Sequence, residues 1–173
     1  MKTNVLILIT FFLALALCSA GQEKRIQRIN FEVDFGIIFG ATRDGAEKLP
    51  LGGTMGMEIR YNLRSLPLNI GLIQELSGFS RVYETGRKEN IRSLKTLGVC
   101  DYNFRRGKAV SMFVGAATGG AIEMNMLSSK RRTLFAFVPR VGLRFFKHVS
   151  LSLDYAMTRV YHNHFDLKLG VYI

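Results

Sequence analysis

Apolar and polar residues alternate with a period of two from Gln27 to Ala41. Bulky apolar side chains hold every second position and charged, polar or glycine residues lie between them: Ile29, Phe31, Val33, Phe35, Ile37 and Phe39 against Asn30, Glu32, Asp34, Gly36 and Gly40. A β-strand places two such sets on opposite faces, whereas a helix would scatter the apolar set around its circumference. The segment is therefore predicted to be a strand with one apolar and one polar face.

The same alternation recurs along the rest of the chain. It predicts seven further strands, at residues 54–64, 68–79, 93–105, 110–121, 133–145, 149–158 and 165–173. The pattern blurs at Ile73-Gln74, where we expect a bulge that shifts the register. Pro139 removes a ladder hydrogen bond and predicts a second local bulge.

The connections between these strands alternate in length. Tight turns are expected around residues 65–67, 106–108 and 147–148, whereas longer polar loops cover 42–53, 80–92 and 122–132, with a shorter fourth loop at 159–163. Short turns at one rim and long loops at the other are typical of outer-membrane barrels, whose short turns lie in the periplasm. The pattern predicts an all-β fold, an eight-stranded antiparallel up-and-down barrel.

Alternation alone leaves open which face points inward, because a soluble lipocalin-like barrel keeps its apolar face inside. The apolar face here carries more Phe, Leu, Ile and Met than the interior of eight strands can hold. The polar face is rich in glycine, which makes room in a narrow, filled lumen: Gly36, Gly40, Gly56, Gly71, Gly115, Gly119, Gly142 and Gly170. We therefore expect a transmembrane β-barrel with its apolar face in lipid.

The first residues of the chain resemble an export signal. Lys2 precedes the apolar run 5–17 and then Cys18-Ser19-Ala20, which predicts a cleavable signal peptide at 1–20, a short periplasmic segment at 21–26 and the barrel at 27–173. The run has 13 residues, fewer than the roughly 20 of a membrane helix. A lipoprotein signal acylated at Cys18 is an alternative. Cleavage would leave only Cys100, and so no internal disulfide.

The net charge of +11 is expected at the two rims rather than in the lumen. Seven acids and six bases fall on the inward face: Glu32, Asp34, Glu58, Glu75, Asp101, Asp154 and Asp166, with Arg60, Arg64, Lys95, Arg140, Arg144 and Lys168. Buried charges persist only when they are paired. We expect a lumenal salt-bridge network of Glu32, Asp34, Glu58, Arg60, Asp101, Arg140, Arg144, Asp154, Asp166 and Lys168.

The mature chain expected after cleavage resembles the small outer-membrane β-barrels of the OmpA transmembrane-domain and OmpX type. The signal peptide, the eight alternating strands and the final Leu167-Lys168-Leu169-Gly170-Val171-Tyr172-Ile173 carry the resemblance. It implies the outer membrane of a Gram-negative bacterium and recognition of the last strand by the barrel-assembly machinery. Ile173 stands where these families usually end in Phe. No catalytic motif accompanies the resemblance.

Two groups of loop residues could carry chemistry. His162 and His164, with Asp166, have a spacing that could bind a metal or supply a base, although a plain surface loop explains them as well; a lipid A-modifying enzyme would also need Ser128 or Ser129 nearby. Five basic residues could pair with lipopolysaccharide phosphates, with a solvated loop as the alternative: Arg87, Lys88, Lys130, Arg131 and Arg132.

These features favour a non-enzymatic outer-membrane barrel whose basic extracellular loops contribute to membrane structure or contact lipopolysaccharide. We expect no catalytic residue, metal, cofactor or nucleic-acid partner, a monomer, and no diffusion pore, since side chains fill an eight-stranded lumen. The competing classes are a lipid A-modifying outer-membrane enzyme and a soluble lipocalin-like binding barrel.

We predict that the protein will fractionate with membranes and migrate faster in SDS gels before boiling than after it, because a closed barrel resists detergent until heat opens it. Gel mobility with and without heating, measured on the membrane fraction, checks this. If the protein is instead found in the soluble fraction and migrates at the same rate before and after heating, it is a lipocalin-like barrel.

Overall fold

The computed structural model describes residues 28–40, 51–82, 88–106, 108–126, 131–146, 148–158 and 163–173. The predicted signal peptide, His162, Ser128, Ser129, Arg87 and Lys130 lie outside these ranges. Within the ranges the structure has eight strands: β1 (Ile29–Gly40), β2 (Leu51–Asn62), β3 (Leu68–Val82), β4 (Lys88–Phe104), β5 (Val110–Asn125), β6 (Arg131–Phe145), β7 (Val149–Thr158) and β8 (His164–Tyr172). None of the described residues belongs to a helix with the length and apolar character of a membrane span.

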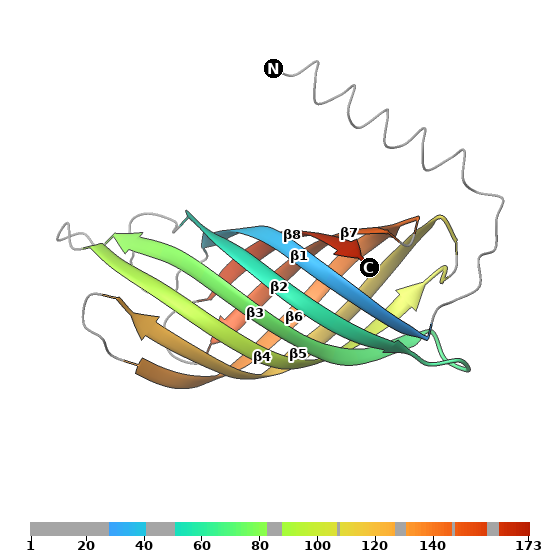
Figure 1. Cartoon of the computed structure of the whole chain (residues 1–173), viewed down its shortest axis with the longest axis horizontal. Coiled ribbons are helices and arrows are strands. Elements are labelled where there is room, and N and C mark those ends of the chain that lie inside the picture. Colours follow the sequence, from blue (N-terminus) through green and yellow to red (C-terminus); the bar gives the residue numbers. More distant parts are fainter. Residues whose placement is uncertain are drawn as a thin grey trace, which may run out of the picture.

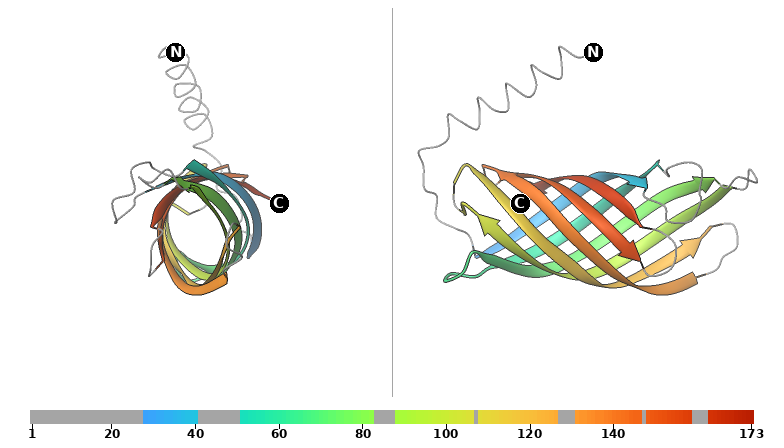
Figure 2. Two further views of the ribbon diagram at one scale, coloured as in Figure 1. Left: turned by 90° about the vertical axis from the view of Figure 1, so that its left-hand side faces the viewer. Right: turned by 180° about the vertical axis from the view of Figure 1, so that it is seen from behind.

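Each strand pairs antiparallel with its neighbour in sequence, and β1 also pairs with β8. In this closing pair Val33 lies opposite Val171 and Gly40 opposite His164. The view along the axis shows a complete ring, and the side views show strands tilted across it (Figures 1 and 2). The predicted eight-stranded antiparallel up-and-down barrel is confirmed.

Two hairpins extend farther at the long-loop end than the sequence predicts. Strands β3 to β6 have 15 to 17 residues, whereas β1, β2, β7 and β8 have 9 to 12. Their backbone ladders continue through residues expected in loops, with Val82 opposite Lys88 and Met124 opposite Arg131 (Figure 1, left). Ladder hydrogen bonds need no alternation of side chains, so pairing continues beyond the apolar pattern.

The outer surface carries a continuous apolar belt. At points spread around the barrel, Phe35 on β1 is 57% exposed, Leu72 on β3 61%, Phe135 on β6 61% and Leu169 on β8 53%. Monomeric soluble proteins rarely expose contiguous apolar patches beyond a few hundred Å², on the order of 300–600 Å². The apolar face therefore points to lipid, as predicted, and the lipocalin-like arrangement, with that face inside, is excluded.

Both predicted bulges are wrong. Strand β3 keeps one register with β2 and with β4 through Ile73 and Gln74. Pro139 lies opposite Ala116 in an unbroken β5–β6 ladder; toward β7 the pairing stops at Val138 and Pro139 and resumes in the same register. A missing proline donor thus interrupts one ladder without inserting a residue.

The blurred pattern instead reflects a local exchange of polarity between the two faces. Ile73 and Leu97 point inward, whereas Gln74 and Thr96 are exposed outside and hydrogen-bonded to each other at 2.8 Å. Inside, these residues belong to an apolar cluster: Ile73, Leu97, Val99, Ala117, Ala121, Ala136, Val138 and Ala156. The lumen therefore holds an apolar cluster on β3 to β7 in addition to the inward charges that these strands carry.

Inward glycines allow neighbouring strands and lumenal side chains to come close. A Cβ on Gly119 would collide with main-chain atoms of Thr96 and Leu97, and a Cβ on Gly170 would collide with the Glu32 carboxylate. Gly120 is the next residue after Gly119 but faces outward, where an added Cβ meets nothing within 4 Å. The space inside the barrel, rather than the strand itself, requires glycine at these inward positions.

This contrast predicts different outcomes for two adjacent substitutions. We expect Gly119→Ala to lower the free energy of unfolding by roughly 1–3 kcal/mol, because overpacking shifts the backbone. Gly120→Ala should change it by less than about 0.5 kcal/mol, as surface substitutions usually do. Urea unfolding of the barrel in lipid vesicles measures both. Equal losses in the two variants would contradict the packing argument.

Candidate functional site

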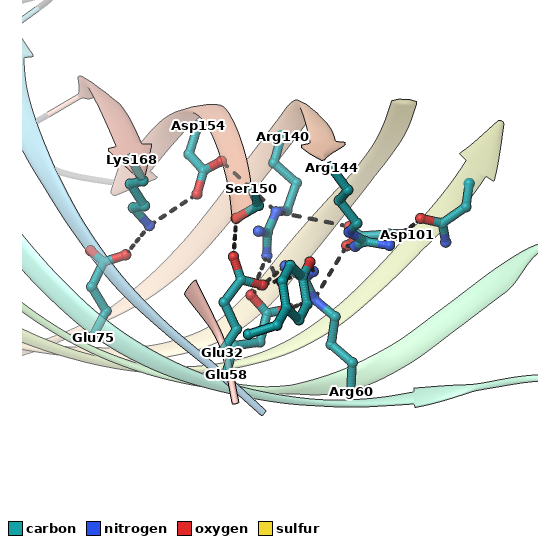
Figure 3. Close-up of polar contacts among 12 residues, drawn as sticks. Glu32, Glu58, Arg60, Glu75, Asp101, Arg140, Arg144, Ser150, Asp154 and Lys168 are labelled. Atoms are coloured by element: carbon teal, nitrogen blue, oxygen red, sulfur yellow. Dashed lines mark hydrogen bonds and ion pairs between the residues drawn. The ribbon is translucent and has the colours of Figure 1, made fainter. Parts of the chain in front are cut away.

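Charged side chains from four strands, β1, β2, β4 and β6, meet in the lumen on the turn side of the barrel (Figure 3). Arg60 on β2 pairs with Glu58 on the same strand through two nitrogens, and its Nη1 lies 2.9 Å from Glu32 Oε2 on β1. The same nitrogen donates to the Tyr172 hydroxyl at 2.6 Å. Arg140 on β6 reaches across the lumen to Glu58 Oε2 at 3.1 Å. Glu58 is thus held between two arginines from opposite sides of the barrel.

Asp101 and Phe113 join this group on β4 and β5. Arg144 Nη2 lies 3.2 Å from Asp101 Oδ2, and Nε of Arg60 and of Arg140 each lie 3.8 Å from an Asp101 oxygen. The Phe113 ring is flanked by the same three guanidinium groups, at 4.5 to 5.5 Å from its centroid. A buried aromatic face attracts cations, so the arginines are held by the ring as well as by carboxylates.

A second group of charges lies nearer the long-loop end. Lys95 Nζ contacts Glu75 Oε1 at 2.7 Å, and Lys168 pairs with the other Glu75 oxygen and, at 2.9 Å, with Asp154 Oδ2. Asp154 Oδ1 lies 3.8 Å from Arg140 Nε, which links the two groups. The result is one network along the lumen.

The structure brings nine of the ten predicted network residues into ion pairs: Glu32, Glu58, Arg60, Asp101, Arg140, Arg144, Asp154, Asp166 and Lys168. Asp34 is buried, but its Oδ1 has no hydrogen-bond partner among the described residues. Glu75 and Lys95, which alternation places inside but which the predicted network omits, pair at its centre. Arg64 was expected inside and is instead exposed in the turn after β2.

His164 does not lie in a loop as expected. It opens β8, is buried in the lumen, and its Nε2 lies 3.2 Å from Lys95 Nζ and 3.5 Å from Asp166 Oδ1. The Phe79 ring packs against it at 5.5 Å. His164 therefore faces lumenal charges and not the membrane surface. No group of three or more potential metal-binding side chains occurs among the described residues.

The predicted basic loop patch divides between the two faces of the barrel. Arg131 and Arg132 are both exposed at the start of β6, but Arg132 lies opposite the inward Glu123, whereas Arg131 lies opposite the outward Met124. Arg92 on β4 pairs with Met124 from the other side. Lys88 begins β4 in the extended hairpin. Sequence reasoning placed Arg92 in a loop and left it out of the patch.

Arg92, Met124 and Arg131 therefore form a row across β4, β5 and β6 on the outer face, which we call the outer arginine row. Two strand spacings separate its arginines, about 10 Å between backbones. The next outward residues toward the membrane centre include Leu94 and Thr133, followed on β6 by Phe135. The row thus lies at the edge of the apolar belt that is nearer the long loops.

Solved structures share this fold. Neisserial surface protein A matches with a TM-score of 0.62 and 11% identity, over 87% of this chain and 99% of that one. The outer membrane enzyme PagL matches with a TM-score of 0.53 and 17% identity, over 81% and 98%. Ail, the attachment invasion locus protein of Yersinia pestis, gives 0.49 and 18%, over 83% and 96%. Neither a family model nor a curated protein sequence matches the chain.

The chain has the fold of a small outer-membrane β-barrel. Its apolar belt and these neighbours agree with the outer-membrane location predicted from the sequence. One neighbour is named as a surface protein and another as an enzyme, so this barrel fold serves both classes. The function has to be argued from the side chains of this chain.

The double pairing of Glu58 makes it a sensitive position in the barrel. We predict that Glu58→Gln will lower the free energy of unfolding by about 3–5 kcal/mol, because it leaves Arg60 and Arg140 buried without their shared carboxylate. The adjacent lipid-facing substitution Met57→Leu should cost less than about 1.5 kcal/mol. Urea unfolding of the barrel in lipid vesicles measures the stability of both variants. Similar stability of the two variants would contradict a structural role for the network.

Proposed function

We propose that this protein is a non-enzymatic outer-membrane barrel that binds lipopolysaccharide phosphate at its long-loop rim. The observation that carries the proposal is the outer arginine row, in which Arg92 and Arg131 flank Met124 on the lipid-facing surface. Both arginines lie on the outer face of the barrel and not in the lumen.

The position of the row suits a phosphate of the outer leaflet. In the outer membrane the long loops face the exterior, so the row lies where the hydrocarbon meets the headgroups. Arginine presents paired N–H donors that match phosphate oxygens. Apolar side chains at the row and below it, Met124 and Leu94, would contact acyl chains. Arg87, Lys88 and Lys130 are proposed as additional contacts, whereas Arg132 lies opposite the inward Glu123.

The lumen supports a surface role rather than transport. Charged pairs run along it, and an apolar group of Ile38, Phe79 and Ile91 covers the network at the long-loop end. Solutes would have to separate these buried pairs in order to pass.

We also propose that the barrel is a monomer assembled by the barrel-assembly machinery through its last strand. The last strand has an exposed apolar outer face, made by Leu167, Leu169, Val171 and Ile173. Asp166 and the other inward residues of β8 face the lumen. Such an outward apolar face resembles the C-terminal signal of the family named above.

The outer arginine row predicts phosphate-dependent binding. We expect the double variant Arg92→Gln/Arg131→Gln to bind lipid A about 30-fold more weakly, since each charge-assisted hydrogen bond lost contributes roughly 1–1.5 kcal/mol in a partly exposed site. The control Arg28→Gln/Lys108→Gln removes two exposed charges at the opposite rim and should bind as the wild type does. Retention of lipid A by the barrel in nanodiscs, measured with bisphosphorylated and dephosphorylated lipid A, checks this.

Equal binding of both lipids by the wild type would contradict the phosphate contact. The non-enzymatic part of the proposal has its own readout, the lipid A mass spectrum of cells with and without the gene. Loss of an acyl chain only in cells that carry the gene would establish the competing enzyme class instead. The two readouts are independent, so each part of the proposal can fail alone.

A further inference from the structure

A groove crosses the lipid-facing surface of β2 to β5, on the turn side of the membrane centre. Its floor consists of small residues, Gly98, Cys100 and Ala116, and large residues on β2 and β3 such as Ile59 and Leu72 line its side. Cys100 and Ala116 are directly opposite each other in the β4–β5 pair. The belt is thus hollowed here, whereas bulky side chains fill it on the other strands.

Two threonines beside the groove make hydrogen bonds within the barrel. The Thr118 hydroxyl donates to the main-chain oxygen of Ala136 at 3.4 Å, and the Thr96 hydroxyl donates to Gln74 at 2.8 Å. The hydroxyl groups of both threonines therefore donate their hydrogen bonds to the barrel itself. An acyl chain, which needs no hydrogen bond, matches this lining.

The rim at the turn end of the groove is basic. Arg106 donates through Nη1 to the main-chain oxygens of Leu63 and Leu66, which ties the β2–β3 and β4–β5 turns together. Arg64 and Arg105, in these two turns, are exposed. The rim therefore offers positive charge below an apolar groove.

The distance from Gly98 in the groove to the basic rim matches the depth of one membrane leaflet. Gly98 lies six residues before Phe104, the end of β4. Six residues span about 20 Å along a strand, and about 15 Å along the membrane normal at a tilt of roughly 40°. Half of a hydrocarbon core of about 30 Å is the same distance.

We propose that an anionic phospholipid of the periplasmic leaflet binds here, with an acyl chain in the groove and its phosphate at Arg64 and Arg105. A second copy of the chain fits less well. Two copies related by an axis along the membrane normal would bring their basic rims together, and like charges would repel. A lipid phosphate neutralises the same charges.

Gly98→Leu fills the groove with little strain, because the nearest heavy atom to an added Cβ is the Thr118 carbonyl oxygen at 3.8 Å. Native mass spectrometry of the folded barrel with added phosphatidylglycerol should show a retained lipid. We expect Gly98→Leu to weaken its retention about tenfold, the loss of roughly two buried methylene contacts. Val171→Leu adds bulk to the outer face of β8 and should retain lipid as the wild type does. Heat-modifiable migration verifies that each variant is folded.

The rim is tested separately. Arg64→Gln/Arg105→Gln should remove the preference for phosphatidylglycerol over phosphatidylcholine of equal chain length, while groove binding of either lipid persists. Equal retention by wild type and Gly98→Leu would overturn the proposal. A dimer that Gly98→Leu abolishes would overturn it too, by showing that a second copy occupies the groove. Neither readout involves lipid A, so this site and the outer arginine row can fail independently.

Discussion

Closure of the sheet is the constraint on which the rest of this structure depends. Unpaired backbone N–H and C=O groups cost several kcal/mol each in hydrocarbon, on the order of 2–7 kcal/mol, so no strand edge can remain open. Pairing of β1 with β8 removes the edge. With eight strands the resulting ring is narrow, and main-chain atoms come so close that a Cβ at Gly71 or Gly119 would collide with the neighbouring strand. The glycines and the compact lumen follow from closure.

The narrow lumen also explains the form of the charge network. A buried charge loses its water, and attraction to one partner rarely repays that loss. Glu58 contacts two arginines, and Lys168 contacts two carboxylates. Because partners are shared along the barrel, one charged group offsets the lost hydration of more than one neighbour. The network occupies the space that a transport path through the lumen would need.

The outer surface is uneven in two places, and both proposals rest there. At the long-loop end, strands extended beyond the apolar belt carry Arg92 and Arg131 outward. On the turn side, small residues at Gly98 and Ala116 leave a groove above a basic rim. Each site joins positive charge to apolar surface. These two features complement the negatively charged phosphate and the acyl chains of a membrane lipid. The PagL likeness concerns the fold, while His164, the described member of the suspected histidine pair, is turned toward Lys95 and Asp166 in the lumen.

The sequence by itself determined the strands and their number, because a period of two is a local property of each segment. The bulk of the apolar face and the glycines of the polar face determined which of the two meets lipid. It also determined that the inward charges nearly balance. Only the tertiary structure decided which charges meet across the lumen: Glu75 on β3 pairs with Lys168 on β8, far away in the chain. It likewise decided that Ile73 and Gln74 exchange faces without a bulge, that His164 points inward, and that Arg131 and Arg132 separate. These outcomes depend on the register between strands and on where each ladder ends, which backbone pairing sets and side-chain alternation does not record.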